Sequence, residues 1–130
     1  MLESQTLNYI KAKKIKFREF SFDTRSLKKR DIFFAIEGSS NNGNNFILEA
    51  QKKGASLIVV SSKTLIPELL KIPFIRVDNV RKELSLSAYL FYKSNIKTKI
   101  AVTGTNGKTS ITFFLKYLLD FTLLIKRKNS

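Results

Sequence analysis

The sequence predicts an α/β fold, because short apolar runs alternate with amphipathic segments along its 130 residues. Hydrophobic residues make up 43% of the chain, which is enough to form a core. The chain has no cysteine and no histidine, which excludes disulfides, thiolate metal sites and histidine general bases. Any chemistry must therefore come from hydroxyls, lysines, carboxylates or a bound nucleotide.

Five short runs rich in β-branched or aromatic residues predict strands. The first alternates apolar and polar residues, and the second is a continuous apolar run that suits a strand covered on both faces. The five ranges are 17–23, 31–36, 56–60, 74–77 and 99–103. Their alternation with helical patterns favours a layered α/β architecture over an all-α or all-β one.

Three segments have the apolar spacing of helices that pack on a sheet. Asn44 or Asn45 can cap the first, which ends before Gly54. Asn79 can cap the second, which continues to about Tyr92. The third follows a glycine-containing loop near the end of the chain, and its apolar stripe is expected to pack in a core.

The strongest functional signal is residues 103–110, Thr-Gly-Thr-Asn-Gly-Lys-Thr-Ser, between the last predicted strand and the third helix. Its glycines let the backbone curl around an anion, and the helix N-terminus adds partial positive charge. A tight connection alone would need no Gly-Lys-Thr ending, so the pattern predicts a phosphate-binding loop. Lys108 would reach the terminal phosphates, and the Thr109 hydroxyl would bind Mg²⁺.

The net charge of +14 raises the alternative of a non-enzymatic basic module that binds nucleotides or nucleic acid. Against nucleic acid, the charges are spread along the chain and no nucleic-acid motif accompanies them. No secretion signal is present, and the longest apolar region, residues 111–125, is interrupted by Lys116 and Asp120. We therefore expect a cytoplasmic protein with no membrane partner.

The loop at 103–110 resembles the ATP-binding loop of the Mur ligases, the cytoplasmic ATP-dependent enzymes that build the peptide stem of peptidoglycan. Residues 22–25, 30–38, 42–47 and 77–82 resemble the N-terminal domain of the MurE branch. The resemblance implies a small mixed α/β UDP-sugar-binding domain at 1–95. It also implies that residues 96–130 form the first strand, phosphate loop and helix of an incomplete central ATP-binding domain.

MurE enzymes add the third residue of the stem peptide to UDP-N-acetylmuramoyl-L-alanyl-D-glutamate through an acyl phosphate made with ATP. The resemblance therefore implies this substrate, with ATP and Mg²⁺ as cofactors. A MurF-type fragment is the alternative within the family, but Thr105 and Asn106 favour MurE. The ATP-binding residues carried over from the motif are Gly104, Thr105, Asn106, Gly107, Lys108, Thr109 and Ser110.

The resemblance also assigns UDP-sugar-binding residues near the N-terminus, where hydroxyls can read a uracil edge. They are Phe22, Thr24, Ser39, Ser40 and Asn41. The family often has histidine at position 39, where this chain has serine. A turn could equally use Thr24 as a cap, and residues 39–42 could merely connect a strand to a helix. Asp23 and Arg25 are expected to hold the turn through charge-assisted hydrogen bonds.

Only 20 residues follow Ser110, and the carboxylates, modified lysine and C-terminal domain of a working ligase would lie beyond them. We expect a chain truncated just after the ATP-binding loop that has no catalytic residue and no ligase activity alone. A separate chain that supplies the remainder of the ligase is a further candidate partner.

Overall fold

The computed structural model describes residues 2–39, 41–92 and 102–128, with side chains as far as residue 120. The chain forms two compact units, Met1–Ser94 and Asn95–Ser130. This division lies one residue from the domain boundary expected after residue 95. The assignment of the two units to the two ligase domains remains a prediction.

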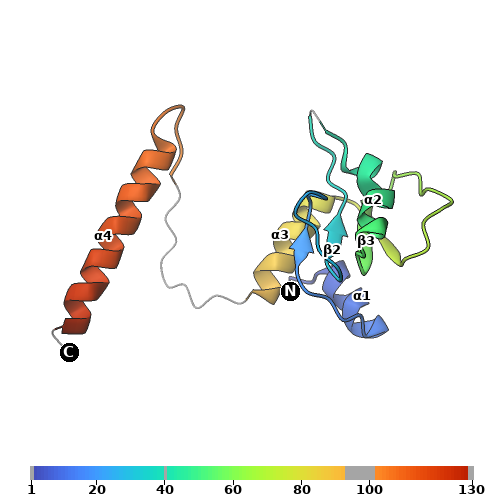
Figure 1. Ribbon diagram of the computed structural model, residues 1–130, viewed down its shortest axis with the longest axis horizontal. Helices are drawn as coiled ribbons and strands as arrows, with labels where there is room; N and C mark the ends of the chain where they lie inside the picture. The colour runs from blue at the N-terminus through green and yellow to red at the C-terminus, as the bar shows by residue number, and fades with distance from the viewer. Residues whose placement is uncertain (1, 40, 93–101, 129–130) are drawn as a thin grey trace. The chain divides into compact units, whose positions relative to one another are not determined.

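The first unit contains a parallel sheet in which each strand lies beside the one before it, in the order β1-β2-β3-β4 (Figure 1). The strands are β1 (Phe20–Ser21), β2 (Ile32–Phe34), β3 (Leu57–Ser61) and β4 (Phe74–Val77). Because all four run in the same direction, their carboxyl ends share one edge of the sheet. In parallel sheets this edge is where ligands bind.

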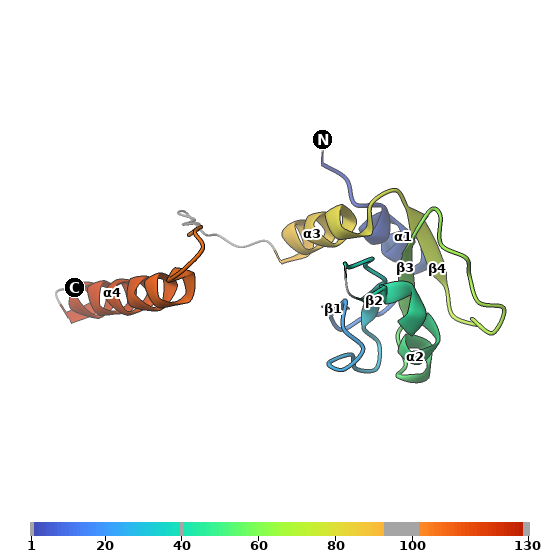
Figure 2. The same cartoon turned by 90° about the horizontal axis from the view of Figure 1, so that it is seen from above.

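Helices cover both faces of the sheet, as Figure 2 shows with α1 and α3 on one side and α2 on the other. The helices are α1 (Gln5–Lys13), α2 (Ile47–Lys52), which follows the short 3₁₀ helix η1 (Gly43–Phe46), and α3 (Val80–Phe91). Strands β2 and β3 are buried on both faces, which explains their continuous apolar sequences.

Alternating strand residues divide the core into two clusters, one on each face of the sheet. The cluster with α2 contains Phe33, Ile58, Val60, Ile47 and Ala50, together with Leu27, Ala35 and Ala55. The cluster with α1 and α3 contains Ile32, Phe34, Leu57, Val59 and Val77, together with Ile10 and Val80. This arrangement confirms the predicted α/β fold class.

Four of the five predicted strands are confirmed in position, and some of them differ in length. Residues 74–77 match β4, whereas the prediction at 17–23 reduces to Phe20 and Ser21, because only these two residues pair with β2. The prediction at 99–103 falls mostly outside the described residues. Val102 and Thr103, which are described, are not in a strand.

One of the two predicted helix caps is confirmed and the other is wrong. Asn79 caps α3, since its side chain accepts a hydrogen bond from the backbone N–H of Lys82 at 2.9 Å. The cap expected at Asn44 or Asn45 is instead Asn42, which accepts from the N–H of Asn44 at 2.9 Å. The cap lies earlier in the sequence than predicted because η1 adds one 3₁₀ turn to the helical segment before α2.

Helix α1 was not predicted, because its apolar positions are few and its sequence is mostly polar. Ser4 caps it, accepting a hydrogen bond from the N–H of Leu7 at 3.0 Å. One carboxylate oxygen of Glu83, on α3, accepts two hydrogen bonds, from the Ser4 hydroxyl at 2.7 Å and from the backbone N–H of Thr6 at 2.8 Å. These buried bonds attach α1 to α3.

The second unit contains the helix α4 (Lys108–Lys128), which begins directly after Gly107, as predicted. Its apolar side chains are largely exposed, among them Ile111, Phe113, Phe114, Leu118 and Leu119. The predicted packing of this stripe in a core is therefore not seen among the described residues. None of the described helices is long and apolar enough to cross a membrane.

Candidate functional site

A cavity of about 400 Å³ lies beside the carboxyl ends of β1 and β2. Three of the five predicted UDP-sugar residues, Phe22, Thr24 and Asn41, line it. Ser39 is exposed and does not line this cavity, and Ser40 lies outside the described residues. The full lining is Phe22, Asp23, Thr24, Arg25, Phe33, Ile36, Asn41, Gly43 and Phe46.

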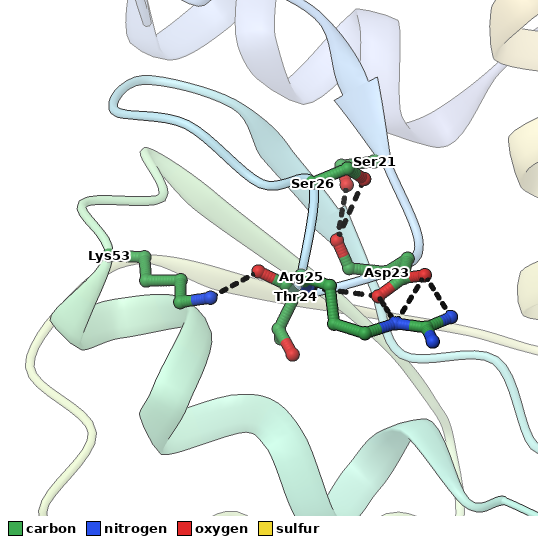
Figure 3. Close-up of polar contacts among 6 residues, drawn as sticks. All are labelled: Ser21, Asp23, Thr24, Arg25, Ser26 and Lys53. Carbon is green, nitrogen blue, oxygen red and sulfur yellow. Dashed lines mark hydrogen bonds and ion pairs between the residues drawn. The ribbon is translucent and has the colours of Figure 1, made fainter.

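The rim of the cavity is the link that carries the chain from β1 back to the start of β2. Its turn is held by Asp23, whose carboxylate accepts hydrogen bonds from the Arg25 backbone N–H at 2.9 Å and from the guanidinium at 2.6 and 3.0 Å (Figure 3). The Arg25 guanidinium and backbone N–H lower the pKa of Asp23 from 3.8 to about 2. The structural role predicted for these two residues is confirmed.

Thr24 lies at the centre of this turn and is 5% exposed. The ammonium group of Lys53, just after α2, donates a hydrogen bond to the Thr24 carbonyl at 2.6 Å (Figure 3). Lys53 also forms an ion pair with Glu49 on α2 at 3.3 Å. Hydrogen bonding from Thr24 and then from Lys53 lowers the pKa of Glu49. Helix α2 therefore fixes the position of Thr24 beside the cavity.

The opposite side of the cavity depends on a close approach of the backbone at Gly43. A Cβ atom at this position would lie 2.6 Å from the Ile36 nitrogen and 2.7 Å from the Ala35 carbonyl carbon, so only glycine fits. The N–H of Gly43 donates to the Ile36 carbonyl at 2.9 Å. This contact holds together the two ends of the loop that carries Asn41.

Both apolar and polar residues line the cavity. Phe33 is fully buried, Ile36 and Phe46 are half-buried, and Phe22 is 64% exposed. Aromatic and aliphatic walls suit a flat ring, whereas the hydroxyl and amide groups of Thr24 and Asn41 can orient it. The sequence gives no separate signal for Phe33, Ile36 and Phe46, because they belong to the core pattern.

In the second unit, residues 105–107 of the predicted phosphate loop form a bend before α4, and residues 108–110 form the first turn of that helix. Gly107 has a φ of +75°, a conformation that favours glycine, and its carbonyl accepts from the N–H of Ile111 at 3.0 Å. Residues 104–110 are exposed. The first N–H groups of a helix have no partner within it, so this exposed terminus can receive an anion.

The described part of the second unit does not assemble a metal site by itself. Among the residues that the structure describes, no group of three or more carboxylate, cysteine or histidine side chains could hold a metal ion. The predicted Mg²⁺ ligand, Thr109, is exposed at the start of α4. A single hydroxyl fits a Mg²⁺ ion that takes most of its ligands from phosphate and water.

Comparison with known proteins finds relatives that share one name. No family model matches the chain. Three curated relatives share the name UDP-N-acetylmuramoyl-L-alanyl-D-glutamate--2,6-diaminopimelate ligase. The relative from Clostridium tetani is 44% identical over 110 residues, which is 82% of this chain and 22% of the relative. The relative from Aquifex aeolicus is 39% identical over 76% of this chain and 20% of its own length. The relative from Wigglesworthia glossinidia is 37% identical over 78% of this chain and 22% of its own length.

The chain is a homologue of the N-terminal region of the Mur ligases. It spans about one fifth of the length of the curated relatives that it matches. A MurF ligase from Thermotoga maritima in complex with ADP is 28% identical, with a TM-score of 0.53 over 71% of this chain and 21% of its own. The UDP-N-acetylmuramoylalanyl-D-glutamyl-2,6-diaminopimelate--D-alanyl-D-alanyl ligase from Acinetobacter baumannii is 25% identical, with a TM-score of 0.55 over 72% of this chain and 20% of its own.

Proposed function

We propose that the first unit binds the UDP part of UDP-N-acetylmuramoyl-L-alanyl-D-glutamate and that residues 103–110 bind ATP. The two sites belong to a ligase that activates the substrate carboxylate as an acyl phosphate and adds the third residue of the stem peptide. The cavity that gathers Phe22, Thr24 and Asn41 carries this proposal. The homologous ligases support the reaction, and their name makes 2,6-diaminopimelate the proposed amino acid.

The cavity suits a uridine nucleotide in three respects. Its apolar lining residues can hold the flat base, and its polar lining residues Thr24 and Asn41 can bind the edge of that base. Its location at the carboxyl edge of a parallel sheet is the usual position for a nucleotide. The net charge of +14 attracts a substrate that carries a diphosphate.

The second site follows from the phosphate loop. Backbone N–H groups between Gly104 and Ser110 would surround the ATP phosphates, and Lys108 would neutralise the terminal ones. Mg²⁺ would enter with ATP and bind the Thr109 hydroxyl, and it would supply charge neutralisation of the phosphates. The ADP complex of the similar MurF ligase supports nucleotide binding here. We place the reaction in the cytoplasm, where ATP is available.

A MurF-type function is the alternative within the family. The solved structures similar to this chain include a MurF ligase at 28% identity. The curated relatives named for diaminopimelate addition are 36 to 44% identical. The higher identity favours the MurE-type reaction.

Calorimetric titration of the chain with UDP tests the proposal. Thr24→Val keeps the shape of the side chain and removes its hydroxyl, so it should weaken UDP binding about tenfold, the loss of roughly one hydrogen bond. Ser62→Ala removes an exposed hydroxyl away from the cavity lining and should bind UDP as the wild type does. Absence of saturable UDP binding by the wild type would refute the proposal.

A further inference from the structure

Three separate segments of the first unit are rich in basic residues, and each of them leads into a strand. The first runs from the last turn of α1 toward β1, the second precedes β2, and the third joins α2 to β3. Because these strands are parallel, their starts share the amino edge of the sheet, opposite the edge that carries the cavity. The three segments are residues 11–18, 28–30 and 52–56.

Hydrogen bonds join the three segments to one another. The Arg18 backbone N–H donates to the Arg30 carbonyl at 2.9 Å, and the Arg30 N–H donates to the Gly54 carbonyl at 2.7 Å. The Ser56 hydroxyl donates to the Lys16 carbonyl at 3.4 Å. Basic residues that are spread along the sequence are therefore brought together at one edge of the fold.

Most of the positive charge at this edge is not neutralised by carboxylates. Arg18 forms ion pairs with Glu19 at 3.1 Å and with the buried Asp31 at 2.8 Å. Lys53 forms an ion pair with Glu49 at 3.3 Å. The other basic side chains of the three segments are exposed, and none forms an ion pair with a residue that the structure describes. These side chains, which we call the basic edge, are Lys11, Lys13, Lys14, Lys16, Lys28, Lys29, Arg30 and Lys52.

Neutralisation of helix ends explains only part of the basic edge. Lys11 and Lys13 lie in the last turn of α1, and Lys52 lies in the last turn of α2, where a cation is favourable beside the free carbonyls. Residues 28–30 belong to no helix and have no such role. Like charges held close together repel one another, so the basic edge favours a partner that supplies several negative charges.

We propose that the basic edge binds the phosphate backbone of nucleic acid without reading its sequence. Lysine side chains that neutralise closely spaced phosphates release condensed counterions, which drives such binding. Within the three described segments no exposed side chain is large and apolar, since Ile15 and Phe17 are half-buried against the core cluster beside α1. Stable attachment to a membrane takes an apolar or lipid anchor besides basic residues, which favours nucleic acid as the partner. This site is separate from the proposed UDP site, because no residue of the basic edge lines that cavity.

The test is the fluorescence anisotropy of a short labelled DNA duplex of mixed sequence, titrated with the full chain at several salt concentrations. With about four phosphate contacts, the wild type should lose about 100-fold in affinity between about 50 and 200 mM salt. A triple variant takes one lysine from each segment, Lys16→Gln, Lys28→Gln and Lys52→Gln. It should make the slope of log affinity against log salt shallower by about three, one for each lysine.

A second triple variant is the matched control for net charge. Lys63→Gln, Lys82→Gln and Lys116→Gln remove the same charge from exposed positions outside the basic edge, so this variant should keep the wild-type slope. A thermal melt checks that both triple variants are folded. If the first is not, its three single variants replace it, and each should reduce the slope by about one.

Three results would overturn the proposal. The first is a wild type that does not bind the duplex at low salt. The second is an equal loss of affinity in the two triple variants, which would show that total charge matters and its location does not. The third is sedimentation of the chain with phosphatidylglycerol vesicles in the absence of duplex binding, which would assign the basic edge to a membrane surface.

Discussion

The two units of this chain bury their apolar side chains to very different extents. In the first unit, strands β2 and β3 bury every apolar side chain, and Ile58 is fully inaccessible. In the second, the stripe on α4 is exposed, with Phe114 66% and Ile111 49% accessible. An amphipathic stripe therefore predicts that the apolar face of a helix packs against another segment, but it does not predict which segment that is.

The largest expected effect is on the core of the first unit. Ile58→Ala removes fully buried methylene and methyl groups from β3 and should lower the free energy of unfolding by about 4 kcal/mol. Phe114→Ala on α4 removes a larger side chain but should change it by less than about 0.5 kcal/mol. Urea unfolding monitored by circular dichroism measures both. Equal destabilisation by the two variants would show that α4 is packed in the same cooperative core.

An intermediate effect separates the binding functions of the units. Lys108→Ala removes the cation expected at the terminal phosphates and should weaken MgATP binding at least about tenfold. UDP binding and the stability of the first unit should not change. Lys116→Ala, on an exposed position of the same helix, is the control for lost charge. Equal MgATP affinity in the wild type and Lys108→Ala would argue against the phosphate loop.

The smallest effect concerns pH and belongs to the turn of the first unit. Arg25 holds the folded-state pKa of Asp23 at about 2, below its ordinary 3.8, so ionised Asp23 favours the folded state above about pH 4. This contribution is lost as the pH falls toward 2. Asp23→Asn should therefore lose less stability than the wild type between neutral pH and about pH 3. The measurement is the urea concentration at the unfolding midpoint, which should become the same for both proteins as the pH approaches 2. An equal decline of the midpoint in both proteins would contradict the stabilising role of ionised Asp23.

Local signals account for the parts of the fold that the sequence predicts well. Residues 74–77 and the cap at Asn79 were predicted because a β-branched run and an asparagine before an apolar stripe act over a few residues. Helix α1 was missed because its own sequence is mostly polar, and the Glu83 carboxylate that holds its first turn is 77 residues from Thr6. The cap at Asn42 was missed because neighbouring asparagines are chemically equivalent candidates.

The candidate site shows the same division between local and distant causes. Phe22, Thr24 and Asn41 were assigned by resemblance, and the structure places them around one cavity. The contribution of Gly43 could not be predicted, because it depends on the approach of the backbone at Ile36 and Ala35. The influence of Lys53 on Thr24 likewise requires the contact between α2 and the turn, which are 29 residues apart in sequence.

The order of the strands has a consequence for synthesis on the ribosome. Every strand pairs with the one made immediately before it, so no strand has to wait for a distant partner. Pairing over short separations reduces the loop-closure entropy lost on folding and favours rapid assembly. The sheet can therefore grow strand by strand during translation, and it is complete once Val77 has left the exit tunnel.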